Sequence, residues 1–242
     1  MYDSDYWWRK TMKKHMLLVF AVAPMTAFAG VTADLEVVSD YRFNGVSQTD
    51  KGPALQGALD YSHDSGIYAG TWASNVDFGG KDDTNLEWDY YLGYYRDINP
   101  AFGFDIGYAQ YTYHGASDSD DHDYGEYYLG LYFNANTTLY WYHAPEYFGL
   151  DTDHNIFKLT HSMPLGDYTL AFAAAHSVSG DKDILAWDKN EASYQYAEAA
   201  ISRMFHGFDI KATVMTTTID DDFNDNGNST VVLSVKRSFK LM

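Results

Sequence analysis

The sequence predicts an all-β fold: a transmembrane antiparallel up-and-down β-barrel of about 12 strands that follows an N-terminal signal peptide. Apolar and polar residues alternate with period two from Ala33 onward, and no long helical pattern interrupts them. Short turns alternate with longer loops, as in outer-membrane barrels. Aromatic residues make up 17% of the chain, yet its mean hydropathy is only -0.38. A lipid-facing outside around a polar inside explains both values.

The N-terminus is predicted to be an export signal. A basic stretch at 13–15 precedes an apolar run at 16–23, and Ala-Phe-Ala at 27–29 offers a small-x-small cleavage site. The apolar run is too short to span a bilayer. A short amphipathic helix of the mature fold is the alternative. Met12 is the expected start, because it opens a typical signal sequence, "MKKH". The predicted domains are a signal peptide, 1–29, in which 1–11 is a mis-called start, and a barrel, 30–242.

The first predicted strand, 33–43, sets the pattern of the barrel wall. One face carries Leu35, Val37, Tyr41 and Phe43, and the other carries Glu36, Val38, Asp40 and Arg42. We expect the rings Tyr41 and Phe43 at the outer membrane interface, where amphipathic aromatic side chains are favoured. We expect the charges in the lumen, because a basic residue on the lipid face near the bilayer midplane costs about 2–4 kcal/mol.

The remaining strands follow in order, five clear and six weaker. The clear segments are 54–62, 67–76, 86–95, 104–109 and 126–133. The weaker ones are 137–143, 155–163, 168–176, 193–203, 208–218 and 229–239, and in the tenth strand Ala197, Ala199 and Ile201 are compatible with either face. Turn-forming residues lie at 64–66, 99–100, 134–136, 166–167 and 206–207, between longer loops. A soluble β-sandwich is the alternative that strands and turns alone leave open.

Residues 39–78, "SDYRFNGVSQTDKGPALQGALDYSHDSGIYAGTWASNVDF", closely resemble the N-terminal signature of the TorF family of porin-like proteins. Similarity at 87–98 and 103–113 is looser. The resemblance implies a bacterial outer-membrane barrel that acts as a pore. Such barrels usually end in an aromatic residue that the barrel assembly machinery reads. Here Phe239 is followed by three more residues, so either Phe239 still serves as that signal or insertion is less efficient.

The candidate site is the lumen. Alternation directs these pore-lining charges inward: Glu36, Asp40, Arg42, Asp60, Glu87, Asp89, Asp105 and Glu126, with Lys158, Lys211 and Lys236 expected to join them. Acids outnumber bases, so a pore would favour cations or neutral polar solutes. The alternative is that the charges pair and plug the barrel. Tyr91, Tyr95, Tyr128 and Tyr132 would narrow the bore, whereas Gly93, Gly107 and Gly130 would leave room.

The acidic loops and the histidines are weaker candidates for a site. The loops at 117–123 and 220–228 are dense in aspartate, and the second matches the start of a calcium-loop pattern but has Leu233 where that pattern needs glutamate. The other interpretations are that the loops bind divalent cations loosely and are bridged by them to anionic lipopolysaccharide, or that the loops are simply solvated. His143, Glu146 and His154 could ligate a metal, although nothing fixes their spacing.

Several classes of function are disfavoured. A net charge of -18 argues against nucleic-acid binding, and the absence of cysteine excludes disulfides and thiolate metal sites. No G-x-S-x-G, Walker or H-E-x-x-H motif occurs, and Ser162 beside His161 would point to the opposite face of its strand. We therefore expect neither an enzyme nor a cofactor. A barrel enzyme such as a lipid hydrolase is a distant alternative.

The expected function is an outer-membrane porin-like channel for passive diffusion of small polar solutes, with a leaning toward cations. The alternative is a non-conducting barrel that has a structural or surface-interaction role through its acidic loops. The expected partners are outer-membrane lipid and lipopolysaccharide, small polar solutes or cations, and the barrel assembly machinery through Phe239. A homo-oligomer is compatible with this class, but no interface can be read from the sequence.

Overall fold

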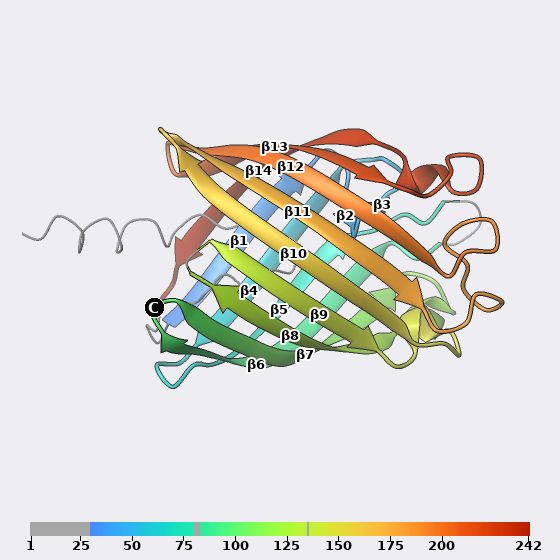
Figure 1. The fold of residues 1–242 in the computed structure, drawn as a ribbon, viewed down its shortest axis with the longest axis horizontal. Helices are drawn as coiled ribbons and strands as arrows, with labels where there is room; N and C mark the ends of the chain where they lie inside the picture. Colours follow the sequence, from blue (N-terminus) through green and yellow to red (C-terminus); the bar gives the residue numbers. More distant parts are fainter. Residues whose placement is uncertain (1–29, 80–82, 135) are drawn as a thin grey trace, which may run out of the picture.

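The computed structural model describes residues 30–79, 83–134 and 136–242, and the predicted signal peptide lies outside these residues. In the described part, twelve antiparallel strands close into one barrel in the order β1-β14-β13-β12-β11-β10-β9-β8-β7-β6-β5-β4 (Figure 1). The predicted fold class and strand number are confirmed. Two further short strands, β2 (Arg42–Phe43) and β3 (Val46–Ser47), pair with each other rather than with the wall.

Most wall strands match the predicted segments closely, but the first, predicted at 33–43, ends at Val38, and the strand predicted at 104–109 is longer, at Phe102–His114. Their bounds are β1 Gly30–Val38, β4 Ala54–Ser62, β5 Ile67–Asn75, β6 Leu86–Asn99, β7 Phe102–His114, β8 Tyr124–Phe133, β9 Thr137–Ala144, β10 His154–Leu165, β11 Tyr168–Ser179, β12 Ser193–Phe205, β13 Phe208–Thr217 and β14 Thr230–Lys240. Three 3₁₀ turns lie in the loops: η2 Ser119–His122, η3 Tyr147–Gly149 and η4 Asp225–Gly227. Among the described residues, no helix is long and apolar enough to cross a membrane.

The barrel has a short-turn end and a long-loop end. The turns between β4 and β5, β10 and β11, and β12 and β13 are tight, and Gly66, Gly166 and Gly207 adopt the positive φ that such turns require. The short connections between β6 and β7 and between β8 and β9 lie at the same end. The connections between β1 and β4, β5 and β6, β7 and β8, β9 and β10, β11 and β12, and β13 and β14 lie at the opposite end, and they include the three 3₁₀ turns of the described residues (Figure 1). The backbone N–H of Val31 donates to the carbonyl oxygen of Met242 at 3.3 Å, so both ends of the described chain lie at the short-turn end.

The outer surface of the wall is apolar and the inner surface is polar and aromatic. On β1, Leu35 and Val37 are each 54% exposed, whereas Glu36 between them is 5% exposed. The alternation that the sequence left open on β12 is settled, because Ala197, Ala199 and Ile201 face outward. Large apolar side chains also cover the outside of the other strands, among them Leu92, Ile106, Leu159, Val214 and Leu233.

Tyrosine rings fill the space that the inward glycines were predicted to leave, so that prediction is wrong. A Cβ placed on Gly93 would lie 2.3 Å from the Tyr68 hydroxyl oxygen, and one on Gly107 would lie 2.2 Å from the Tyr128 hydroxyl oxygen. Gly130 faces a tyrosine ring in the same way. These glycines allow the rings to approach the wall closely and do not widen the bore.

Gly107→Ala is expected to destabilise the barrel by about 1–3 kcal/mol, the usual range for overpacking. Its methyl group would meet the Tyr128 hydroxyl and lie 2.6 Å from the carbonyl oxygen of Leu92, which is backbone and cannot swing away. Urea unfolding of the barrel in lipid vesicles measures the change. Gly57→Ala is the matched control, because its Cβ would lie 3.6 Å from Leu35, an ordinary contact. Equal stability of the two variants would contradict the tight packing.

Candidate functional site

The chain between β1 and β4 folds back into the barrel and forms a plug, here called the hairpin segment (residues 39–53). Figure 1 shows β2 and β3 within the outline of the wall. The segment turns at Asn44 and Gly45, whose φ angles are 50° and 87°. Two positive φ values match the two-residue turn that Asn-Gly favours in hairpins. The turn pairs Arg42 with Ser47 and Phe43 with Val46.

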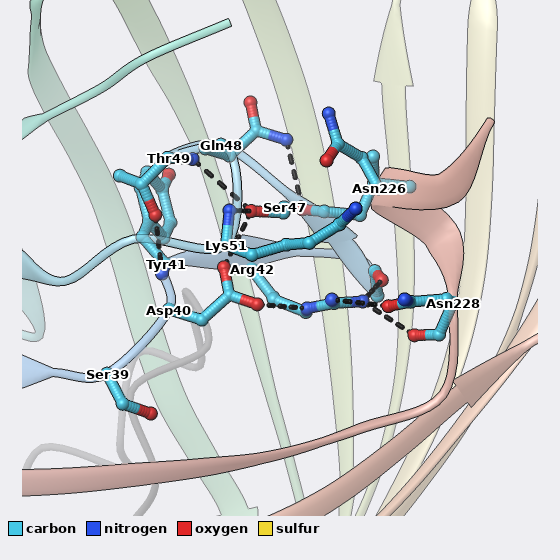
Figure 2. A network of polar contacts seen from close by, with 12 residues as sticks. Ser39, Asp40, Tyr41, Arg42, Ser47, Gln48, Thr49, Lys51, Asn226 and Asn228 are labelled. Atoms are coloured by element: carbon cyan, nitrogen blue, oxygen red, sulfur yellow. Dashed lines mark hydrogen bonds and ion pairs between the residues drawn. The ribbon is translucent and has the colours of Figure 1, made fainter. Parts of the chain in front are cut away.

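A buried ion pair holds the hairpin segment in its shape. The Arg42 Nε donates to Asp40 Oδ2 at 2.7 Å, and the Ser47 hydroxyl donates to the other oxygen of Asp40 at 2.6 Å (Figure 2). The Ser47 Oγ in turn accepts from the backbone N–H of Lys51 at 2.8 Å, and the Thr49 Oγ1 accepts from the backbone N–H of Tyr41. These hydrogen bonds hold residues 40–51 in one compact turn.

The hairpin segment is also bonded to the loop that follows β13. Arg42 donates to the backbone oxygen of Asn228 at 2.8 Å and to its side-chain oxygen at 2.9 Å (Figure 2). Lys51 forms an ion pair with Asp225 in η4. Since the side chain of Arg42 is 1% exposed, its charge is satisfied wholly by protein groups.

The tip of the hairpin segment spans the lumen. On one side, the Tyr41 ring contacts Trp72 of β5 at a centroid distance of 5.3 Å, and Phe43 contacts Tyr111 of β7 at 6.0 Å. On the other side, the hydroxyl of Tyr194 on β12 donates to the Asn44 backbone oxygen at 3.0 Å. These contacts with opposite parts of the wall place the segment across the bore.

The predicted positions of Tyr41 and Phe43 at the outer membrane interface are wrong. Tyr41 is 7% exposed inside the barrel, and Phe43 is half-buried there. The wall strand β1 ends at Val38, and the chain then turns inward. Burial, with the Glu87 and Asp89 carboxylates near it, raises the pKa of Tyr41 well above its ordinary value, so its hydroxyl stays protonated.

The eight predicted pore-lining charges all lie in the barrel interior, although on two kinds of element. Asp40 and Arg42 belong to the hairpin segment, whereas Glu36, Asp60, Glu87, Asp89, Asp105 and Glu126 belong to the wall. Asp60 is half-buried and the others are at most 7% exposed. The structure brings Glu87, Asp89 and Glu126 near one another on β6 and β8. Their pore-lining role stays a prediction.

Basic side chains occupy the other side of the interior and are paired with acids there. Lys236 of β14 lies 2.7 Å from Asp34 of β1, and Lys211 of β13 lies 3.9 Å from Glu36. Lys158 of β10 is 2% exposed, with its amino group 5.5 Å from the centre of the Tyr196 ring. The carboxylates of β6, β7 and β8 have no ion pair with any described basic residue. The interior is therefore acidic on one side and nearly neutral on the other.

The candidate histidine site does not assemble. His154 points inward and is 1% exposed, whereas His143 lies on the outward face, stacked on Trp141. Adjacent cross-strand positions on β9 and β10 send them to opposite faces. The described residues contain no group of three or more His, Asp or Glu arranged to hold a metal ion. The calcium-loop match likewise forms η4, a single 3₁₀ turn.

One buried pair escaped the sequence analysis. His154 Nε2 lies 2.8 Å from the Ser177 Oγ, across the pairing of β10 with β11. The second ring nitrogen of His154 has no hydrogen-bond partner in the described part of the chain, so no acid orients the ring as a general base requires. The pair is therefore a packed polar contact. Its two residues lie far apart in the sequence, so no local sequence pattern predicts that they meet.

The acidic loops hold their charge at the surface of the long-loop end. Asp220 accepts from the backbone N–H of Asp222 at 2.9 Å and pairs with Lys189 at 3.2 Å. These two contacts lower the pKa of Asp220 below its ordinary value. The ion pair is exposed and contributes little to stability.

A closed antiparallel barrel with an apolar outside and a polar inside is the architecture of transmembrane β-barrels. Residues 22–239 match the family described as "Bacterial protein of unknown function (Gcw_chp)", and the chain belongs to that family. No curated protein matches the chain.

Solved porins share the fold. The "KdgM porin" is similar with a TM-score of 0.54 and 10% identity, over 86% of this chain and 99% of that chain. The NanC porin is similar with a TM-score of 0.53 and 10% identity, over 87% of this chain and all of that one (100%). Identities this low show the shared fold alone.

Proposed function

We propose that the chain is a bacterial outer-membrane barrel of the porin type that passes small polar solutes and favours cations. The observation that carries the proposal is the division of the wall into an apolar outside and an inside whose carboxyl groups on β6, β7 and β8 have no basic partner among the described residues. The likeness to the KdgM and NanC porins supports the fold side of this proposal, and the resemblance of residues 39–78 to the TorF family agrees with it. In this frame the long loops face the cell exterior and the short turns face the periplasm.

The charge preference is argued from the ion pairs. Asp34, Glu36 and Asp40 have basic partners, whereas Glu87, Asp89, Asp105 and Glu126 have none among the described residues. Uncompensated carboxylates along a bore attract cations and repel anions. Solutes that enter once the hairpin segment has moved aside would therefore meet carboxyl groups without basic partners along β6, β7 and β8.

The test is single-channel conductance of the barrel, residues 30–242, in a planar bilayer with a salt gradient. We expect discrete steps and a reversal potential on the cation side. Asp89→Asn should move the reversal potential toward zero, whereas Asp220→Asn in the exposed loop should leave it in place. A folded barrel that gives no steps, or an anion-side reversal potential, would overturn the proposal.

One observation favours a second candidate, a non-conducting barrel that acts through its loops. The hairpin segment crosses the lumen and is held by a buried ion pair. If it never leaves, the acidic loops at the long-loop end become the working surface. Absence of conductance in both the wild type and a variant without the Arg42 anchor would favour this candidate.

Leu92→Arg tests the membrane placement. Leu92 lies on the outer face of β6 and is 61% exposed, so an arginine there would meet lipid. We expect a loss of about 2–4 kcal/mol in unfolding free energy in phospholipid vesicles. The control is Gln195→Arg, on the outer face of β12 near the long-loop end, where the expected loss is small. Equal losses for both variants would argue against a lipid-facing belt.

A further inference from the structure

Three arginines lie on the outer face of the wall near its short-turn end. They are Arg96 on β6, Arg203 on β12 and Arg237 on β14, and each lies two or three residues before its strand ends. The burial patterns place all three side chains on the face that carries the apolar residues. On a lipid-facing surface, a basic residue is costly at the bilayer midplane and nearly neutral close to an interface. In the proposed membrane placement, these arginines therefore lie at the level of the headgroups of the periplasmic leaflet.

Two aromatic rings hold the side chain of Arg237, and the three residues are here called the arginine clamp (Phe208, Arg237 and Phe239). The guanidinium carbon of Arg237 lies 4.9 Å from the centre of the Phe208 ring on β13 and 5.4 Å from the centre of the Phe239 ring on β14. A cation over the face of an aromatic ring is attracted by the electrons of that face. Both rings lie on the exposed outer surface, so a ligand can reach the clamp from the membrane.

The charge of Arg237 has no polar partner within the protein. Among the described residues, no carboxylate forms an ion pair with it and no group accepts a hydrogen bond from its guanidinium. The other two outward arginines differ. Arg203 pairs with Asp167 at 3.1 Å, and Arg96 donates to the Tyr94 hydroxyl at 3.2 Å. A guanidinium with unused N–H groups matches a phosphate group, which it can contact through two parallel hydrogen bonds.

The surface beside the arginine clamp is apolar and has no acidic side chain. Leu35 of β1 lies directly opposite Arg237, and Val235 of β14 lies opposite Ile210 of β13. All three apolar side chains are exposed on the outer face. A phospholipid can place its phosphate on the guanidinium and its acyl chains along these residues, whereas inorganic phosphate would contact the guanidinium alone.

The charges around the arginine clamp favour one class of phospholipid. The outward positions of β1, β13 and β14 hold no aspartate or glutamate. The ammonium group of a zwitterionic headgroup would therefore have no partner at the clamp and would lie close to a second positive charge. An anionic headgroup has no such group, so charge complementarity favours an anionic phospholipid.

We propose that the arginine clamp binds the phosphate group of an anionic phospholipid in the periplasmic leaflet. Such a site goes beyond the proposed function and shares with it only the membrane placement of the barrel. The clamp lies on the outer face of the wall, so lipid binding there requires no movement of the hairpin segment. The lipid supplies the acceptor that the guanidinium of Arg237 does not find within the protein.

The test is native mass spectrometry of the detergent-solubilised barrel, which counts bound lipid molecules by their mass. The probes are dioleoylphosphatidylglycerol, which is anionic, and dioleoylphosphatidylcholine, which has the same acyl chains and a zwitterionic headgroup. We expect the wild type to bind the anionic lipid about fivefold or more tightly than the zwitterionic one, and an excess of inorganic phosphate should not displace it. Arg237→Gln should weaken binding of the anionic lipid about fivefold or more, because the charged contact is lost.

The matched control is Arg96→Gln, which removes the same charge from the same end of the outer face and leaves the arginine clamp intact. It should bind the anionic lipid as the wild type does. Phe208→Leu keeps the charge of the clamp but removes one ring, so it should weaken binding to a smaller extent than Arg237→Gln. If Arg237→Gln does not fold, judged by heat-modifiable electrophoretic mobility, Phe208→Leu provides the comparison.

Four results would overturn the lipid site: no preference for the anionic lipid, its displacement by inorganic phosphate, equal binding to Arg237→Gln and the wild type, or an equal loss of binding in Arg237→Gln and Arg96→Gln. Conductance of the same proteins separates the site from the porin. Binding that depends on Arg237 in a barrel without conductance would leave the lipid site and remove the porin. Conductance without a lipid preference would leave the porin and remove the lipid site.

Discussion

Arg42→Ala is expected to release the hairpin segment and raise single-channel conductance several-fold. The substitution removes both hydrogen bonds to Asn228 and the ion pair that satisfies Asp40. Loss of one member of a buried ion pair costs about 3–5 kcal/mol, because the remaining charge is left uncompensated. That cost falls on the infolded state of the segment alone, so the segment should move out while the wall stays closed. Conductance in a planar bilayer and trypsin cleavage after Lys51 measure the release.

The matched control for Arg42→Ala is Lys51→Ala. Lys51 also links the hairpin segment to the loop after β13, but its ion pair with Asp225 is substantially exposed and is worth at most about 1 kcal/mol. Its loss should leave conductance unchanged. Arg42→Lys should rescue poorly, since an ammonium cannot contact Asp40 and Asn228 with the same planar fork. Wild-type conductance in Arg42→Ala would show that the ion pair does not hold the plug.

Trp72→Ala is expected to be the most destabilising single truncation of the interior, at about 3–5 kcal/mol. Trp72 is 7% exposed, packs in the cluster with Val38, Ala54 and Val76, and supports the ring of Tyr41. Its removal leaves a cavity between the wall and the hairpin segment, so both should loosen. Urea unfolding in lipid vesicles measures the stability, and trypsin cleavage after Lys51 reports on the segment.

Trp88→Ala offers the comparison for Trp72→Ala on the neighbouring strand. Trp88 lies outward and is 41% exposed, so its truncation removes surface contact without a buried cavity. We expect a clearly smaller loss of stability and no new cleavage after Lys51. A loss as large as that of Trp72→Ala would mean that the outer aromatic surface stabilises the barrel as much as the interior does.

Strand positions can be predicted from the sequence because the alternation of a barrel wall is local. The segment 54–62 was predicted with the bounds of β4, since its outward leucines and inward polar residues follow period two without interruption. The confirmed strand number has the same origin. The tenth strand was ambiguous because alanine is small enough for either face, and only its pairing with neighbours decided the direction.

The plug could not be read in the same way. Alternation continues through Tyr41 and Phe43 because residues 42–43 are extended again in β2. A wall strand followed by a short hairpin therefore has the same sequence pattern as one long wall strand. The Asn44-Gly45 dipeptide was the available signal for a turn. The partner of Arg42, Asn228, lies on the loop after β13, and no local pattern predicts such a contact. An inward glycine is compatible either with an open bore or with a tyrosine ring packed against the wall. The tyrosines that occupy this space lie on other strands, so the sequence around each glycine does not distinguish the two cases.

The meeting of β1 with β14 has a consequence for how the barrel assembles. Every other neighbouring pair in the wall is joined by one connection, whereas Val37 pairs with Val235 near the opposite end of the chain. The molecule is thus a string of hairpins with a single seam of very high sequence separation, and contacts of that kind form slowly. Until the seam closes, the edges of β1 and β14 remain open to other strands. The ion pair of Asp34 with Lys236 crosses this seam, and that of Glu36 with Lys211 lies beside it. We expect both ion pairs to form late in folding and to affect the rate at which the barrel closes more than the shape of the closed wall.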